Sequence, residues 1–156
     1  MGEYITYICL LIGLGCSVYI TFEDFRTRYI SWYPLAGLFL SGVFFHWEYS
    51  LEYWTLSAGL NLGFILLMLA VLVIYLRLKG VKGIMDTYLG WGDIVMMIAV
   101  LPWFSFEQYI FWYVGSTIFA LMVSLFIIKL RKKEKDYPIP FAGYMGMMFV
   151  CFQLLQ

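Results

Sequence analysis

Residues 54–76 read WTLSAGLNLGFILLMLAVLVIYL and contain no Asp, Glu, Lys or Arg. This stretch is long enough to cross a bilayer as one helix, because a transmembrane helix needs about 20 apolar residues. Outward from it, further apolar segments lie at about 4–22, 32–46, 87–106, 108–128 and 138–155, separated by short polar stretches. The sequence therefore predicts an all-α polytopic membrane protein with six transmembrane helices. We expect residues 1–156 to form one domain, because the connections are too short for a second.

The composition excludes a water-soluble globular domain. Of the 156 residues, 63% are hydrophobic and 13% are charged, and the mean hydropathy is +0.85. Ordinary soluble domains are about 45–50% apolar and about 25% charged. We therefore expect the lipid bilayer, and no nucleic acid, as the surroundings of this chain.

The basic residues predict how the chain is oriented in the membrane. All of them lie in the first, third and fifth connections between the predicted spans: Arg26, Arg28, Arg77, Lys79, Lys82, Lys129, Arg131, Lys132, Lys133 and Lys135. The second and fourth connections carry Glu48, Glu52 and Glu107 and no basic residue. By the positive-inside rule the basic connections are cytoplasmic, and both the N-terminus and the C-terminus lie outside.

Small and polar residues inside the spans indicate how the helices pack. Gly59 and Gly63 form a GxxxG pattern in the third span, and Gly143 and Gly146 lie in the sixth. Such residues allow two backbones to approach closely in lipid. We expect Asn61, the one amide well inside a span, to form a hydrogen bond between helices.

Four other residues could suggest a metal or a redox site but favour a structural role. Cys9, Cys16 and Cys151 all fall in apolar stretches, where a thiol behaves as a small hydrophobic group. His46 has no neighbouring Cys or His, so we interpret it as an interfacial residue. The sequence predicts no metal site.

Two carboxylates, Asp24 and Asp93, stand out because an ionisable side chain at the edge of the hydrocarbon is costly and marks a functional site by default. Asp24 ends the first apolar stretch, and Asp93 follows Gly90 and Gly92. From Asp93 to the end of its span the helix would be about 21 Å long, shorter than a hydrocarbon core of about 30 Å. We therefore expect Asp93 to lie about 9 Å below the cytoplasmic face.

The predicted topology places both carboxylates at similar depth on the same side. Two close carboxylates cannot both stay ionised, so one proton is shared between them. Such a pair can hold a water, deprotonate it as it attacks a peptide carbonyl and protonate the leaving amine, with no metal or other cofactor. Gly90 and Gly92 would let the backbone bend and let an extended peptide approach Asp93.

A structural interpretation accounts for the same two residues. Asp93 follows a glycine and could cap the start of a helix, and Asp24 could pair with Arg26 or Arg28 at a loop edge. The residues alone leave both interpretations open.

Three motifs occur in a fixed order along the chain. They are Asp24-x-Arg26-x-Arg28-x-Ile30, Gly90-Trp91-Gly92-Asp93 and Pro138-Ile139-Pro140-Phe141-Ala142. Together they resemble the type IV prepilin peptidases and archaeal preflagellin peptidases, six-span intramembrane aspartyl proteases of the GxGD class. The resemblance covers nearly the whole chain. It differs from the family pattern at Ser31, where the family often has Pro, and at Val95, where it often has Lys.

The resemblance implies that Asp24 and Asp93 are the catalytic pair and that Gly90 and Gly92 shape the loop. It also implies an endopeptidase of the cell membrane that removes a short basic leader, at the cytoplasmic side, from prepilin-like precursors with an apolar N-terminal helix. Because nothing precedes the first span, the chain resembles the short members, and we expect no methyltransferase activity. We expect four acidic residues on the same face to attract the leader: Glu23, Asp86, Glu134 and Asp136.

Two alternatives remain open from the sequence. A protease of the presenilin or signal-peptide-peptidase type shares GxGD, but its first motif has Tyr before the Asp, where this chain has Glu23. A non-enzymatic six-span protein, such as a transporter or a pilus assembly scaffold, would also be a compact helical bundle. The sequence identifies neither the substrate nor the oligomeric state.

Overall fold

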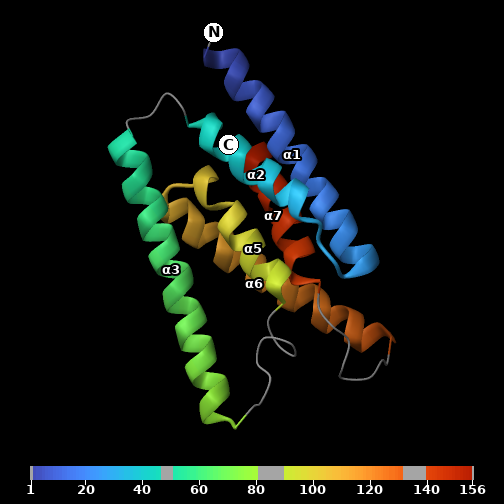
Figure 1. Cartoon of the computed structure of the whole chain (residues 1–156). Coiled ribbons are helices and arrows are strands. Elements are labelled where there is room, and N and C mark those ends of the chain that lie inside the picture. Colours follow the sequence, from blue (N-terminus) through green and yellow to red (C-terminus); the bar gives the residue numbers. More distant parts are fainter. Residues whose placement is uncertain (1, 47–50, 81–89, 132–139, 156) are drawn as a thin grey trace.

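The chain is almost entirely helical. The computed structural model describes residues 2–46, 51–80, 90–131 and 140–155. Within these residues the chain forms six α-helices, one 3-10 helix and no strand. In chain order these are α1 (Gly2–Thr27), α2 (Trp32–Phe45), α3 (Leu51–Leu78), α5 (Trp91–Ala99), η1 (Leu101–Trp103), α6 (Phe106–Arg131) and α7 (Phe141–Leu155) (Figure 1). The predicted all-α fold class is confirmed.

The helices differ in their capacity to cross a membrane. Three are long and apolar enough to do so, at Tyr4–Thr27, Trp54–Leu78 and Phe106–Ile127. Three apolar stretches are shorter, at Trp32–Phe45, Trp91–Trp103 and Phe141–Leu155. The protein is therefore a membrane protein with at least three helices of spanning length in its described part.

The fourth predicted span is not one continuous helix. The sequence predicts a span over 87–106, but α5 ends at Ala99, η1 follows, and α6 begins at Phe106. Pro102 accounts for the break, because proline has no N–H to donate and its ring clashes with the carbonyl four residues earlier in a helix. Residues 87–89 of that prediction lie outside the described part of the chain.

Trp103 of η1 anchors the centre of the bundle. It is 2% exposed, and its indole Nε1 donates a hydrogen bond to the Leu38 carbonyl of α2 at 2.8 Å. Its ring occupies the space that a side chain at Gly13 of α1 or at Gly42 of α2 would need. Around this centre α1 packs along α2 and α7, α7 also packs against α6, and α3 leans to one side (Figure 1).

The glycine predictions are right for α7 and wrong for α3. An added side-chain carbon at Gly143 or Gly146 would meet α1 atoms at once, so the close approach predicted there is confirmed. Gly59 and Gly63 are exposed, and a carbon added at either would meet nothing within 4 Å among the described residues. The physical reason is that α3 turns this face away from its neighbours.

The packing face of α3 contains Asn61, which is fully buried. Its Nδ2 donates to the carbonyls of Leu101 and Phe104, at 3.4 and 3.0 Å. These bonds tie α3 to the irregular connection between α5 and α6. The predicted hydrogen bond between helices is therefore confirmed.

We expect Asn61→Leu to lower the free energy of unfolding by about 1 kcal/mol, because it removes a donor shared by two buried carbonyls. Thermal unfolding in detergent measures the change. The control is Leu60→Ala, at an exposed position of the same helix. An unchanged melting temperature for Asn61→Leu would contradict the assigned anchoring role.

The cysteines are only partly as predicted, and the interfacial position of His46 stays a prediction. Cys9 is buried and the Cys16 thiol packs near Gly37, as expected of packing residues. Cys151 is exposed, so the packing prediction is wrong for it: its position on α7 faces outward. His46 follows α2, and its Nε2 lies 3.3 Å from the Trp103 carbonyl.

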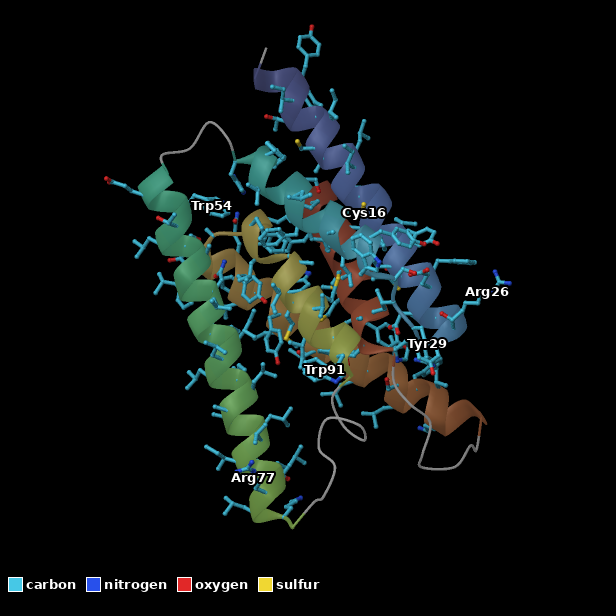
Figure 2. All side chains as sticks on the ribbon, viewed as in Figure 1. Cys16, Arg26, Tyr29, Trp54, Arg77 and Trp91 are labelled. Atoms are coloured by element: carbon cyan, nitrogen blue, oxygen red, sulfur yellow. The ribbon has the colours of Figure 1, made fainter. Side chains whose placement is uncertain are left out.

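The helix ends alternate as expected for a polytopic protein. The C-terminal ends of α1, α3 and α6 and the N-terminal ends of α5 and α7 lie toward one end of the molecule (Figure 1). Arg26 and Arg77 lie toward this end, and Trp54 lies toward the other (Figure 2). The first and third connections therefore share an end that carries basic side chains.

Candidate active site

Asp24 lies near the end of α1 on a strip of polar residues that faces α7. Ser17, Thr21 and Asp24 are spaced four and three residues apart, which places them on one face of a helix. Ser17 Oγ donates to the Gly146 carbonyl at 3.0 Å, and Thr21 Oγ1 lies 3.3 Å from the Gly143 carbonyl. These contacts align α1 with the first turns of α7 and leave Asp24 only 7% exposed.

The start of α7 donates hydrogen bonds to both aspartates. The Gly143 N–H donates to Asp24 Oδ2 at 2.7 Å, and the Ala142 N–H donates to Asp93 Oδ1 at 2.9 Å. The first N–H groups of a helix lack partners within it, and the helix dipole favours negative charge at this end. Pro140, just before α7, has no side-chain oxygen with which to cap them. Two aspartates from different helices thus cap one helix start on consecutive amides.

Asp93 is the third residue of α5, and two glycines shape its surroundings. The Gly90 N–H donates to Asp93 Oδ2 at 3.3 Å. A side-chain carbon at Gly90 would lie 3.1 Å from the same oxygen, and one at Gly92 would lie 2.9 Å from Ile30 Cδ1. Gly92 therefore admits Ile30, and the expected approach of an extended peptide to Asp93 stays a prediction. Through this contact the first motif packs against the second.

The structural interpretation of the two aspartates explains only part of this arrangement. Asp93 does accept a local bond from Gly90, as a capping residue would, and the charge of Arg28 acts on Asp24. The Ala142 donor, however, lies 49 residues along the chain from Asp93, and the Gly143 donor lies 119 residues from Asp24. If each aspartate only capped a helix start near it in the sequence, neither would need to reach the start of α7. The two carboxylates accept from consecutive amides of α7, so they lie close to each other.

The connection between α1 and α2 fixes the end of the first motif. Arg28 has a φ of +63°, the left-handed conformation that ends many helices. Glu23 accepts hydrogen bonds from the Ser31 N–H at 2.9 Å and from the Ser31 hydroxyl at 2.7 Å. Proline at position 31 would lack this N–H, so the departure from the family pattern has a structural use here.

Glu23 has a structural role that the sequence did not reveal. Its carboxylate holds the start of α2, and its expected attraction for a basic leader stays a prediction. The other acidic residues expected to attract the leader, Asp86, Glu134 and Asp136, lie outside the described residues.

Other features of the described residues lie away from the pair. Among them, no group of three or more His, Cys, Asp and Glu side chains has the arrangement of a metal site. A pocket of about 200 Å³ lies beside His46, Trp54 and Gln108. Trp54 and Trp91 lie toward opposite ends of the molecule, so this pocket is remote from the start of α5 (Figure 2).

The sequence reasoning missed the residues that assemble the pair. Ser17 and Thr21 are visible in the sequence as polar residues on the Asp24 face of an apolar helix, and this spacing is the signal that could have found them. The Ala142 and Gly143 donors are backbone groups, which every residue except proline has. The lack of a capping side-chain oxygen at Pro140 is a weak signal, because Gly90 at the start of α5 lacks one too.

The family comparison covers both aspartates. The sequence model of the type IV leader peptidase family matches residues 11–125 of the chain. This range contains the first two motifs and stops before α7. Neither the curated proteins nor the solved structures gave a match to the chain. Because the matched range is most of the sequence, the chain belongs to the type IV leader peptidase family.

Proposed function

We propose that this protein is an intramembrane aspartyl endopeptidase that removes a short basic leader from type IV prepilin-like precursors. Family membership supports a peptidase of leader-bearing substrates. The observation that carries the aspartic mechanism is the pair of hydrogen bonds from Ala142 and Gly143 to Asp93 and Asp24. These bonds hold two carboxylates from separate helices at the first turn of α7.

The proposed chemistry uses one proton and one water. With Asp24 and Asp93 sharing a proton, the anionic carboxylate accepts a proton from the water as its oxygen attacks the peptide carbonyl. The protonated carboxyl then donates to the leaving amine, so the pair ends with one proton, as it began. Each aspartate accepts from an α7 amide through one oxygen, and in this proposal these bonds fix the orientation of the two carboxyl groups.

The proposed membrane arrangement has six spans in a single domain covering residues 1–156. In it α1, α2, α3, α5 with η1, α6 and α7 each cross the membrane, and both termini lie outside. The alternating helix directions and the basic residues at one end support this topology. The aspartates then lie at the cytoplasmic side of the cell membrane, where the leader of a precursor would be.

Co-expression with a prepilin-like precursor tests the proposed activity. The precursor carries a basic leader followed by an apolar helix, and leader loss appears as a gel shift. The wild type should process the precursor, whereas Asp24→Asn and Asp93→Asn should leave it intact at equal expression. Full processing by either variant would refute the dyad.

Reporter fusions test the orientation separately. We expect a fusion within residues 47–50 or after Ser105 to be exported, because these connections carry no basic residue. A fusion after Arg28 or Lys79 should stay cytoplasmic. Alkaline phosphatase and green fluorescent protein activities measure the two outcomes, and a cytoplasmic signal from the connection at 47–50 would reverse the assigned topology.

A further inference from the structure

A substrate of the proposed peptidase must bring its cut bond to two carboxylates that are largely covered by protein. Both aspartates point away from the exposed faces of their own helices. On α1, Phe22 lies two residues before Asp24 and is 59% exposed. On α5, Trp91 and Val95 flank Asp93 by two residues and are 64% and 40% exposed. Residues two apart in a helix point roughly in opposite directions, so neither exposed face leads to a carboxylate.

The exposed side chains of α7 lie in line with one of them. Gly143, Met147, Cys151 and Leu154 are spaced four, four and three residues apart, so they share one face of this helix, on which Gly143 itself is buried. Met147 is 41% exposed, Leu154 is 70% exposed and Cys151 is exposed. A side-chain carbon at Gly143 would lie 3.1 Å from Asp24 Oδ2, so the carboxylate lies beside the cytoplasmic end of the same face.

Aromatic rings border this end of the face. The Phe25 ring of α1 packs edge-on against Tyr144 of α7 with ring centroids 5.2 Å apart, and Tyr144 packs in the same way against Phe119 of α6 at 5.8 Å. Phe25 is 43% exposed, and its ring atoms lie within 3.1 Å of a carbon added at Gly143. The border is thus apolar and is shared by the two helices that flank α7.

We propose that the exposed face of α7, Met147, Cys151 and Leu154, is where the apolar helix of the substrate docks, with its first turn beside Phe25. The inference rests on the proposed function. An apolar helix that begins at the cut bond and descends into the bilayer runs in the same direction as α7, which begins at the aspartates. The face carries no charged side chain over the length of α7, and its line of residues ends at the buried Gly143, whose N–H binds Asp24. The partner of this face is therefore the apolar transmembrane helix of the substrate, which lies parallel to α7.

The geometry sets a register for this docking. Cys151 lies about 12 Å along the axis from Gly143, at 1.5 Å for each residue. A parallel helix rises at the same rate, so the substrate residue opposite Cys151 should lie about eight residues after the cut bond. Further contacts should recur every three to four residues, the period of a helix face.

Cross-linking from the native Cys151 tests this register. The probe is the Asp24→Asn protein with Cys9→Ala and Cys16→Ala, which leaves Cys151 as its single thiol and the precursor uncut. Precursors with one cysteine scanned along the apolar helix are treated with a short bismaleimide in membranes. We expect the cross-link to peak about eight residues after the cut bond and to weaken on either side. The matched control moves the thiol to α3, as Cys151→Ser with Leu66→Cys, and should show no dependence on position.

A kinetic variant gives an independent measure. We expect Met147→Trp to raise KM for the full precursor about tenfold, because the larger ring blocks the face, and to leave kcat and the melting temperature unchanged. Leu66→Trp, at a 59% exposed position of α3, is the control and should match the wild type.

Three outcomes would overturn the docking face: a cross-link independent of substrate position, equal cross-linking from Leu66→Cys, or cross-linking only between two copies of Cys151. The last would make this face an interface between copies of the chain. If these results accompany loss of cleavage in the aspartate variants, the peptidase proposal stands and only the docking face fails. If Asp24→Asn still cleaves, the proposed function itself fails.

Discussion

Asp24→Asn and Asp93→Asn should each lower the rate of leader removal by about 100-fold to 10,000-fold, the contribution usual for a positioned acid or base. Each substitution removes a carboxyl that would hold or accept the shared proton, while the size of the side chain is kept. The double variant should be no slower than the slower single variant, because the two groups act as one unit. Single-turnover cleavage of a purified precursor in liposomes measures all three rates.

Protein stability provides the control for these variants. Asparagine keeps one oxygen that can accept the Ala142 or Gly143 N–H, so both asparagine variants should melt close to the wild type, although Asp93→Asn loses the longer bond from the Gly90 N–H. Asp24→Ala and Asp93→Ala leave one α7 donor without its acceptor and should lower the free energy of unfolding by about 1–3 kcal/mol. If the rates of the asparagine variants fall only in proportion to their stability, the aspartates are structural and the mechanism is wrong.

Gly146→Ala should lower the cleavage rate by about 100-fold although it lies away from the carboxylates. The added carbon would collide with Thr21 Oγ1 and lie 3.1 Å from the Ser17 carbonyl, so α7 must move away from α1. The Gly143 N–H that holds Asp24 lies one turn earlier on the same helix and moves with it. A displacement of about 1 Å in a catalytic group can cost about 100-fold in rate. The same purified assay measures the effect.

Gly59→Ala is the matched control, because an added carbon there meets nothing within 4 Å in the described chain. It should leave cleavage unchanged and stabilise the helix by up to about 1 kcal/mol, as alanine generally does in place of glycine. A Thr21→Ala substitution in the Gly146→Ala protein removes the colliding hydroxyl and should restore part of the rate. Normal cleavage by Gly146→Ala itself would contradict the assigned alignment of α1 and α7.

The sequence predicts the helices and the two aspartates for the same reason, which is the cost of placing charge in hydrocarbon. Long uncharged stretches must be helices, and the carboxylates that interrupt them require a partner. Asp24 and Asp93 are therefore identifiable from the order of residues alone. Pro102 also signals the break after Ala99, a signal that the prediction of one continuous span leaves out.

The donors to the aspartates could not be predicted, because they are backbone groups selected by tertiary structure. Gly59 and Gly63 show the same limit: their spacing resembles a packing motif, but the direction in which α3 faces is decided by contacts far along the chain. Glu23 looks like a free charge in the sequence because the serine that binds it lies at the start of the next helix. In each case the missing information is which helix face meets which neighbour.

The convergence of both aspartates on α7 also bears on biosynthesis. The ribosome makes Asp24 and Asp93 well before Ala142 and Gly143, since the two hydrogen bonds span 119 and 49 residues. While the earlier helices are being inserted, neither carboxyl has its α7 amide, and the pair lacks the two hydrogen bonds that join it to one helix start. Completion of the candidate site therefore coincides with the arrival of α7 in the bilayer, so a nascent chain would not acquire proteolytic activity before that point.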